Sequence, residues 1–271
     1  MKDIQVRTIT GIIFLVAVIG SILLHPLAFL FLFAFFTIIG LREFLLLQKV
    51  EYKNASVLLF YLPAMLIYFM IAFIGLGYID ISLLVLGIPL LFLFIVFELY
   101  NPVKPNWQRI GSVYSAIVFV VVPFGLMNAL FFNKATNGFK TGILIGLFII
   151  MWSNDIFAYL IGSKFGKNRL FEKHSPKKSW EGSIGGFIFA LIAAYVLSIF
   201  YNQLSSINWL ILGAIIAISG TFGDLAESLL KRNAGVKDSG NLFPGHGGVL
   251  DRFDAVLFAT PFVFVYLNLF S

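Results

Sequence analysis

Long apolar runs recur along the whole chain and constrain its fold more than any other feature. They extend over about 17 to 23 residues, close to the 20 or so that a helix needs to cross the hydrocarbon of a bilayer. Hydrophobic residues make up 60% of the 271 positions and charged residues 12%. The sequence therefore predicts an all-α integral membrane protein built as a polytopic helical bundle.

We predict about nine transmembrane helices from these runs. The predicted spans are Thr8–Leu24, Leu27–Leu47, Ala55–Gly75, Ile81–Phe97, Gly111–Phe132, Thr141–Gly162, Ile184–Phe200, Trp209–Leu230 and Asp254–Phe270. Basic residues in short loops favour the cytoplasm. With the N-terminus in the cytoplasm, only Lys134 and Lys140 of the nineteen Lys and Arg fall outside. An odd number of spans then places the C-terminus outside.

Polarity divides the chain unevenly. Residues 1–135 carry about five spans with short loops, so we predict a helix-packing scaffold there. Residues 136–271 hold two long cytoplasmic loops, 163–183 and 231–253, and are predicted to be the catalytic region. The chain has no Cys, which excludes disulfides and thiolate metal sites. Loop topology already explains the net charge of +6, so nucleic acid is not an expected partner.

Acidic residues lie near the cytoplasmic ends of three predicted spans. Asp155 lies in the sixth span, Asp224 in the eighth, and Asp251 and Asp254 open the ninth. Ionisable groups inside a membrane are costly and usually functional. The expected depths bring these carboxylates into one layer. Oxygen ligands without a Cys or His cluster favour magnesium, as one or two ions.

A polar run from Ser228 to Asp254 joins the last two spans, and it allows two interpretations. Its acids could form buried ion pairs with Lys231, Arg232 and Arg252 that hold helices together. Its glycines instead free the backbone to approach a ligand, so that amides and Lys237 cradle phosphates. His246 could contact a phosphate, a base or a metal, or only pack within the loop.

The other cytoplasmic loop contains the sequence SPKKSWEG, from Ser175 to Gly182. Lys177 and Lys178 could clamp a polyphosphate or a lipid phosphate, with the Trp180 ring at the membrane interface. Alternatively, this segment is a solvated turn that is basic only because cytoplasmic loops of membrane proteins are rich in Lys and Arg.

The polar run resembles the signature of phosphatidate cytidylyltransferases, also called CDP-diacylglycerol synthases. The matching positions are Ser228, Lys231, Arg232, Lys237, Asp238, His246, Gly247, Gly248, Asp251, Arg252 and Asp254. The SNDIFAY stretch from Ser153 to Tyr159 and the SPKKSWEG stretch are also similar to this family. The resemblance covers most of the second half by motif and the whole chain by length and helix count.

This resemblance implies an enzyme that transfers CMP from CTP to phosphatidate and gives CDP-diacylglycerol and pyrophosphate. It implies a homodimer in a bacterial inner membrane, with the active site facing the cytoplasm. The expected catalytic residues are Asp224, Lys231, Asp251 and Asp254, and the expected Mg²⁺ ligands are Asp224, Asp251 and Asp254. The expected substrate-binding residues are Asn154, Asp155, Lys177, Lys178, Ser228, Arg232, Lys237, Asp238, His246, Gly247, Gly248 and Arg252.

Two other functions remain open from the sequence. A CTP-dependent kinase of a polyprenol or another lipid alcohol would share a membrane-embedded nucleotide site, but its hydroxyl nucleophile would need a base. A cation-coupled transporter would also carry carboxylates inside its helices. Its acids should lie near the midplane of the membrane, whereas these acids gather towards one surface.

Overall fold

The computed structural model describes residues 2–50, 56–100, 105–133, 138–139, 141–171 and 175–270, and helices dominate these ranges. Each of the nine predicted spans overlaps a continuous helical stretch. Within the described part, seven helices are long and apolar enough to cross a membrane, and Leu59–Gly75 is a shorter apolar helix. The prediction of an all-α polytopic membrane protein is therefore confirmed. The number of crossings and the sides of the termini stay predictions, and Lys134 and Lys140 lie outside the described residues.

The chain forms two compact units, which are described separately. The first contains Met1–Lys140 and Asn233–Arg252, and the second contains Thr141–Arg232 and Phe253–Ser271. The polar loop after the eighth predicted span thus packs with the N-terminal helices. These units are defined by contacts between residues, so they do not test the predicted functional division into a scaffold and a catalytic region, which stays a prediction.

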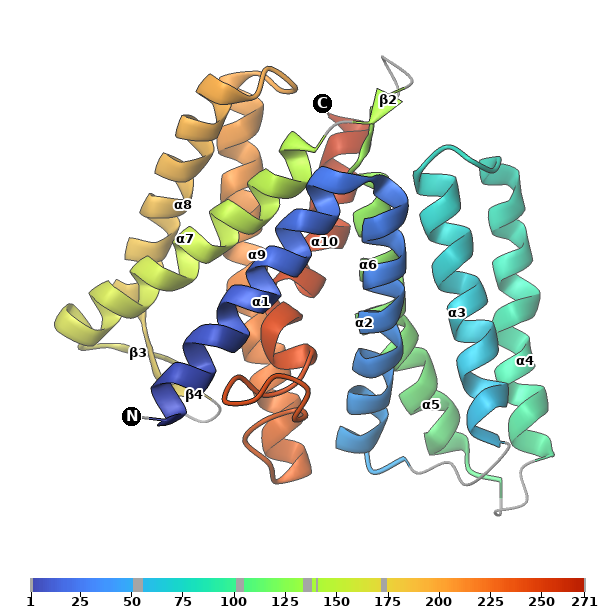
Figure 1. The fold of residues 1–271 in the computed structure, drawn as a ribbon. Helices are drawn as coiled ribbons and strands as arrows, with labels where there is room; N and C mark the ends of the chain where they lie inside the picture. Colours follow the sequence, from blue (N-terminus) through green and yellow to red (C-terminus); the bar gives the residue numbers. More distant parts are fainter. Residues whose placement is uncertain are drawn as a thin grey trace. The chain divides into compact units, whose positions relative to one another are not determined.

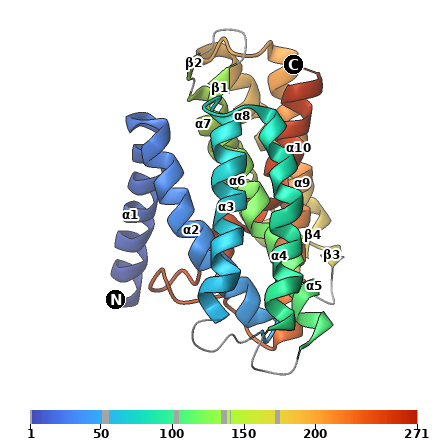
Figure 2. The same cartoon turned by 90° about the vertical axis from the view of Figure 1, so that its right-hand side faces the viewer.

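The first unit is built from antiparallel neighbours that follow one another in sequence (Figures 1 and 2). In both views α3 and α4 lie side by side, and α5 continues through η2, a π-helical turn, into α6. A short two-stranded pairing of β1 with β2 follows. The bounds are α1 Lys2–Leu24, α2 Pro26–Leu47, α3 Ser56–Gly75, η1 Ile81–Leu86, α4 Gly87–Leu99, α5 Trp107–Ala116, η2 Ile117–Val121, α6 Val122–Ala129, β1 Phe132–Asn133 and β2 Gly138–Phe139.

Aromatic rings and a short polar chain hold the core of the first unit. Phe33 of α2 meets Phe124 of α6 edge to face, with ring centroids 5.5 Å apart. Tyr68 of α3 is buried and donates its hydroxyl to the Leu30 carbonyl at 2.7 Å. The Asn128 amide of α6 in turn donates to the Tyr68 hydroxyl at 3.3 Å. These contacts fix α2, α3 and α6 together, and the Tyr68 hydroxyl and the Asn128 amide NH₂ both find partners inside the apolar core.

The second unit is packed through small residues on neighbouring helices. A Cβ on Gly186 of α8 would lie 2.6 Å from the Asn154 carbonyl of α7, and one on Gly223 of α9 would lie 2.6 Å from the Asp254 carbonyl of α10. Such close backbone approach is typical of helix pairs in membranes. The bounds are α7 Gly142–Phe165, β3 Arg169–Phe171, β4 Ser175–Ser179, α8 Trp180–Phe200, α9 Ser206–Ala234 and α10 Leu250–Leu269; α10 begins in the first unit.

Candidate functional site

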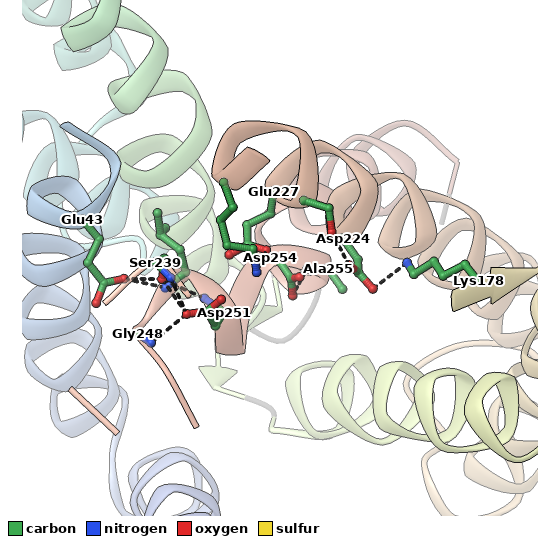
Figure 3. A network of polar contacts seen from close by, with 12 residues as sticks. Glu43, Lys178, Asp224, Glu227, Ser239, Gly248, Asp251, Asp254 and Ala255 are labelled. Atoms are coloured by element: carbon green, nitrogen blue, oxygen red, sulfur yellow. Dashed lines mark hydrogen bonds and ion pairs between the residues drawn. The ribbon is translucent and has the colours of Figure 1, made fainter. Parts of the chain in front are cut away.

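Carboxylates from three helices of the second unit gather around Asp254. This residue of α10 interacts electrostatically with Asp224 and Glu227 of α9 and with Asp155 of α7. Its Oδ1 accepts a hydrogen bond from the Ala255 N–H at 2.8 Å, and Figure 3 shows the group together with Asp224 and Glu227. The predicted convergence is therefore present for Asp155, Asp224 and Asp254, whereas the predicted place of Asp251 in the same layer stays a prediction. Their chemical roles stay predictions.

Two lysines enter this acidic cluster. Lys178 Nζ lies 2.5 Å from Asp224 Oδ2, and Lys231 Nζ lies 2.5 Å from Glu227 Oε2 one helical turn away. The Ser228 hydroxyl donates to Asp224 Oδ1 at 3.3 Å. The Glu227 side chain is 0% exposed, so its pair with Lys231 is internal to the fold. Lys178 and Asp224 remain 25% and 39% exposed, which leaves both open to a ligand.

The donors of this cluster fit a magnesium ion. Four carboxylates and two lysine partners leave an excess of negative charge around Asp254. Mg²⁺ prefers oxygen ligands and is commonly held by one or two carboxylates, with substrate phosphate and water completing its shell. Within the described part of the chain, no three His or acidic side chains are close enough to hold one ion. Magnesium binding at this cluster therefore stays a prediction.

The loop predicted around Lys177 and Lys178 contains an ordered hairpin. β4 pairs antiparallel with β3, and Ser179 caps the N-terminus of α8. Glu181 accepts hydrogen bonds from the Asn168 backbone at 3.1 Å and from its side-chain amide at 2.8 Å. Successive side chains on a strand point to opposite faces. Lys178 reaches Asp224, whereas Lys177 is exposed.

Asp251 lies in the first unit and anchors the polar loop. Its Oδ2 accepts hydrogen bonds from the Ser239 N–H at 2.7 Å, the Ser239 hydroxyl at 2.8 Å and the Gly248 N–H at 2.8 Å (Figure 3). Gly247 has a φ of +80°, and a Cβ there would collide with the Asp251 carboxylate. The positive φ and the contact with Asp251 therefore explain why position 247 is a glycine, and close approach to the Glu43 carboxylate explains the glycine at position 248. The role of Asp251 as a metal ligand stays a prediction, and its neighbour Arg252 is exposed.

Glu43 is a site residue that sequence reasoning missed. This residue of α2 is 5% exposed, and its carboxylate accepts hydrogen bonds from the Val249 and Leu250 N–H groups at 3.0 and 2.9 Å. The Ser239 hydroxyl lies 3.0 Å from its Oε2. The available signal was an acid inside an apolar predicted span, which is costly without a partner.

The remaining predicted residues differ in exposure. Lys237 and Asp238 are exposed on the polar loop, and Arg232 is exposed in the last turn of α9. Asn154 is only 4% exposed, and its amide donates to Asp155 Oδ1 at 3.4 Å. Contact of Asn154 with α8 gives it a packing role, and its role in substrate binding stays a prediction.

His246 packs against α1 beside two arginines of the first unit. A Cβ on Gly11 would meet the His246 ring at 3.7 Å. Partial burial and the charges of Arg252 and Arg7 lower the pKa of His246 below its ordinary value of 6.5, although a hydrogen bond with the Pro244 backbone opposes this. The imidazole is therefore mainly neutral at pH 7 and would contact a phosphate as a neutral group.

The lowered pKa of His246 predicts a pH effect on stability. Because the folded state binds this proton less readily than the unfolded state, stability should fall as the pH drops through about 6.5. The Tm of the purified protein is expected to decrease between about pH 7.5 and 5.5 at constant salt, and less so in His246→Gln. An identical pH slope in wild type and variant would contradict the assignment.

Comparison with known proteins gives independent evidence on the family of this chain. The model described as the cytidylyltransferase family matches residues 5–270. The phosphatidate cytidylyltransferase of Bacillus subtilis (strain 168) is 29% identical over 100% of both chains. The protein of that name from Thermotoga maritima is 38% identical over 67% of this chain and 69% of its own. The one from Staphylococcus aureus (strain COL) is 30% identical over 97% of this chain and 98% of its own.

Proposed function

The chain belongs to the cytidylyltransferase family, and on this premise we propose that it transfers CMP from CTP to phosphatidate, giving CDP-diacylglycerol and pyrophosphate. The names of relatives that match over nearly their whole length support this substrate pair. The observation that carries the proposal is the excess of carboxylates around Asp254, with the Lys178 ammonium at its edge. Such a cluster suits a polyphosphate that binds with a metal ion.

The reaction joins two phosphates. An oxygen of the phosphatidate phosphate attacks the α-phosphorus of CTP, the bond from that phosphorus to the bridging oxygen of the β-phosphate breaks, and pyrophosphate leaves. A phosphate monoester has a second pKa of about 6, so the nucleophile is already largely ionised at neutral pH. The chain therefore needs no general base, and positioning and charge stabilisation carry the catalysis.

The residues would divide this work as follows. Lys178 would bind phosphate oxygens beside Asp224, and Lys231 would remain tied to Glu227 unless substrate draws it away. Asp224 and Asp254 would hold Mg²⁺, and Asp251 joins them as a proposed ligand on the sequence signature alone. One or two bound ions would neutralise charge that develops on the pyrophosphate. Arg232, Lys237 and Arg252 would add positive charge.

The membrane position suits the two substrates. Phosphatidate diffuses within the bilayer, whereas CTP arrives from water. We propose an inner-membrane homodimer whose site faces the cytoplasm, since basic residues predominate in the loops that the topology places there. Cross-linking in the membrane and protease accessibility from each side test these two statements.

Turnover of purified protein tests the function. Detergent-solubilised protein is incubated with phosphatidate, Mg²⁺ and CTP labelled at the α-phosphate, and label in the lipid phase is compared with released pyrophosphate. Labelled lipid in a 1:1 ratio with pyrophosphate is expected from the proposed stoichiometry. Transfer of γ-label instead would indicate a lipid kinase, and cation flux without CTP consumption would indicate a transporter.

Loss of the Lys178 charge is expected to slow the reaction. Lys178→Met should lower kcat/KM by about 10²-fold, because a charge-assisted contact to phosphate is removed and Asp224 loses its partner. Lys164→Met, on the exposed end of α7, is the matched control and should retain activity. Steady-state kinetics with varied CTP provide the measurement. Equal activity of both variants would remove Lys178 from the site.

A further inference from the structure

A buried carboxylate outside the acidic cluster connects three parts of the first unit. Glu43 lies on α2, Ser239 in the polar loop, and Leu250 at the start of α10. Glu43 accepts hydrogen bonds from the N–H groups of Val249 and Leu250, 206 and 207 positions away in sequence. It therefore caps α10, a task that a side chain next to the helix start usually performs.

The Ser239 hydroxyl connects this cap to Asp251. Its Oγ lies 3.0 Å from Glu43 Oε2 and 2.8 Å from Asp251 Oδ2 (Figure 3). One hydroxyl has a single proton, so it donates to one carboxylate at a time. The Ser239 and Gly248 N–H groups also bind Asp251 Oδ2. The orientation of Asp251 thus depends on the position of Ser239, which Glu43 holds.

Two observations show how closely the loop is built around this carboxylate. Burial of Glu43 carries a desolvation cost and the charge of Asp251 adds a smaller repulsion, and the hydrogen bonds that Glu43 accepts oppose both. The loop also approaches Glu43 so closely that a Cβ on Gly240 or Gly248 would collide with its carboxylate. A neutral side chain on the loop could cap α10 without these costs. An acid at this position accepts from Val249, Leu250 and Ser239 at once and so holds the loop beside Asp251 in a defined geometry.

We propose that Glu43 is a positioning residue for the reaction: through Ser239 and the first turn of α10, it fixes the orientation of Asp251. The kinetic part of this inference rests on the proposed function. The local part, that Glu43 orders the loop around Ser239, does not depend on it. A displacement of about 1 Å at a reacting group can lower a rate by about 10²-fold, so the expected kinetic effect is large.

The test compares Glu43→Gln and Ser239→Ala with a matched control. Glu43→Gln replaces one accepting oxygen by a donor, and Ser239→Ala removes the bridge but leaves the cap of α10. Glu98→Gln is the control, since Glu98 is a 2% exposed carboxylate on α4 that pairs with Arg109 at 3.1 Å and accepts from the Asn106 N–H at 2.8 Å.

Three quantities are measured for each folded variant: kcat, Tm and the rate of trypsin cleavage after the exposed Lys237. Glu43→Gln and Ser239→Ala are expected to lower kcat by about 10- to 100-fold and to accelerate this cleavage. Glu98→Gln should lower Tm without either effect. In the double variant of Glu43 and Ser239, the loss of kcat should be less than the product of the single losses, because both act through one contact.

Each outcome separates this inference from the proposed function. Active wild type with unchanged kcat in both variants would overturn the positioning role and leave Glu43 a stabilising residue. Should Glu43→Gln fail to fold, Ser239→Ala decides in the same way. Inactive wild type would overturn the proposed function, whereas the cleavage rate would still decide whether Glu43 orders the loop. Unchanged cleavage in both variants would overturn that local part.

Discussion

Asp254→Asn is expected to remove nearly all turnover while folded protein is recovered in normal yield. Asp254 stands among Asp155, Asp224 and Glu227, and like charges repel one another unless a cation binds between them. We therefore assign Asp254 to the proposed metal site. The predicted fall in kcat is about 10³-fold, the size expected when a principal charge-stabilising group is lost.

The thermal stability of this variant distinguishes metal binding from helix packing. Without Mg²⁺ the Tm of Asp254→Asn should equal or exceed that of wild type, because one of the crowded charges is gone. With Mg²⁺ and CTP only wild type should gain stability, since a ligand that binds the native state raises Tm. Asp80→Asn is the control, because Asp80 caps η1 on an exposed turn and Asn caps equally well. Loss of folded Asp254→Asn would favour the packing interpretation.

Gly223→Ala is expected to damage both stability and activity. An added Cβ would lie 2.6 Å from the Asp254 carbonyl, 2.7 Å from Phe258 Cβ and 3.0 Å from Ala255 Cα, so α9 and α10 would have to separate. Overpacking of this kind costs about 1 to 3 kcal/mol. Because Asp224 follows Gly223 and Asp254 provides the contact, kcat should also fall by about 10-fold or more.

Gly20→Ala is the matched control, since a Cβ on this helical glycine of α1 would meet nothing within 4 Å. It should leave kcat unchanged and stabilise the helix by roughly 0.5 to 1 kcal/mol or have no effect. Unfolding of purified protein in detergent and kcat per folded molecule give both readouts. Equal Tm and kcat for Gly223→Ala and Gly20→Ala would show that α9 and α10 tolerate separation.

Much of the acidic cluster was predictable because depth in a membrane follows from position in a span. Asp155 and Asp224 lie near the cytoplasmic ends of their predicted spans and Asp254 at the start of its own, and these three side chains interact. Glu227 follows Asp224 by three positions, a spacing that places both on one stripe of a helix. The interaction of Glu227 with Lys231 also follows from their spacing of four residues.

Other parts of the site depended on contacts that spacing does not encode. Lys177 and Lys178 are equivalent in the sequence, and only the hairpin of β3 with β4 selects Lys178 to reach Asp224. Glu43 lies 196 residues from Ser239, so no local pattern relates them. Such contacts arise when separate helices pack, and their partners are chosen by geometry rather than by neighbouring residues.

The amino-acid sequence alone predicts the all-α membrane architecture, the position of the helical stretches and the convergence of Asp155, Asp224 and Asp254 in the second half. These properties follow from run length and from the cost of burying charge, both of which are local along the chain. By contrast, the packed fold is needed to see that Glu43 caps α10, that Ser239 joins it to Asp251, and that Lys178 pairs with Asp224. Hydrogen bonds and ion pairs need atoms within a few ångströms, and for residues far apart in sequence only the packed fold sets that distance.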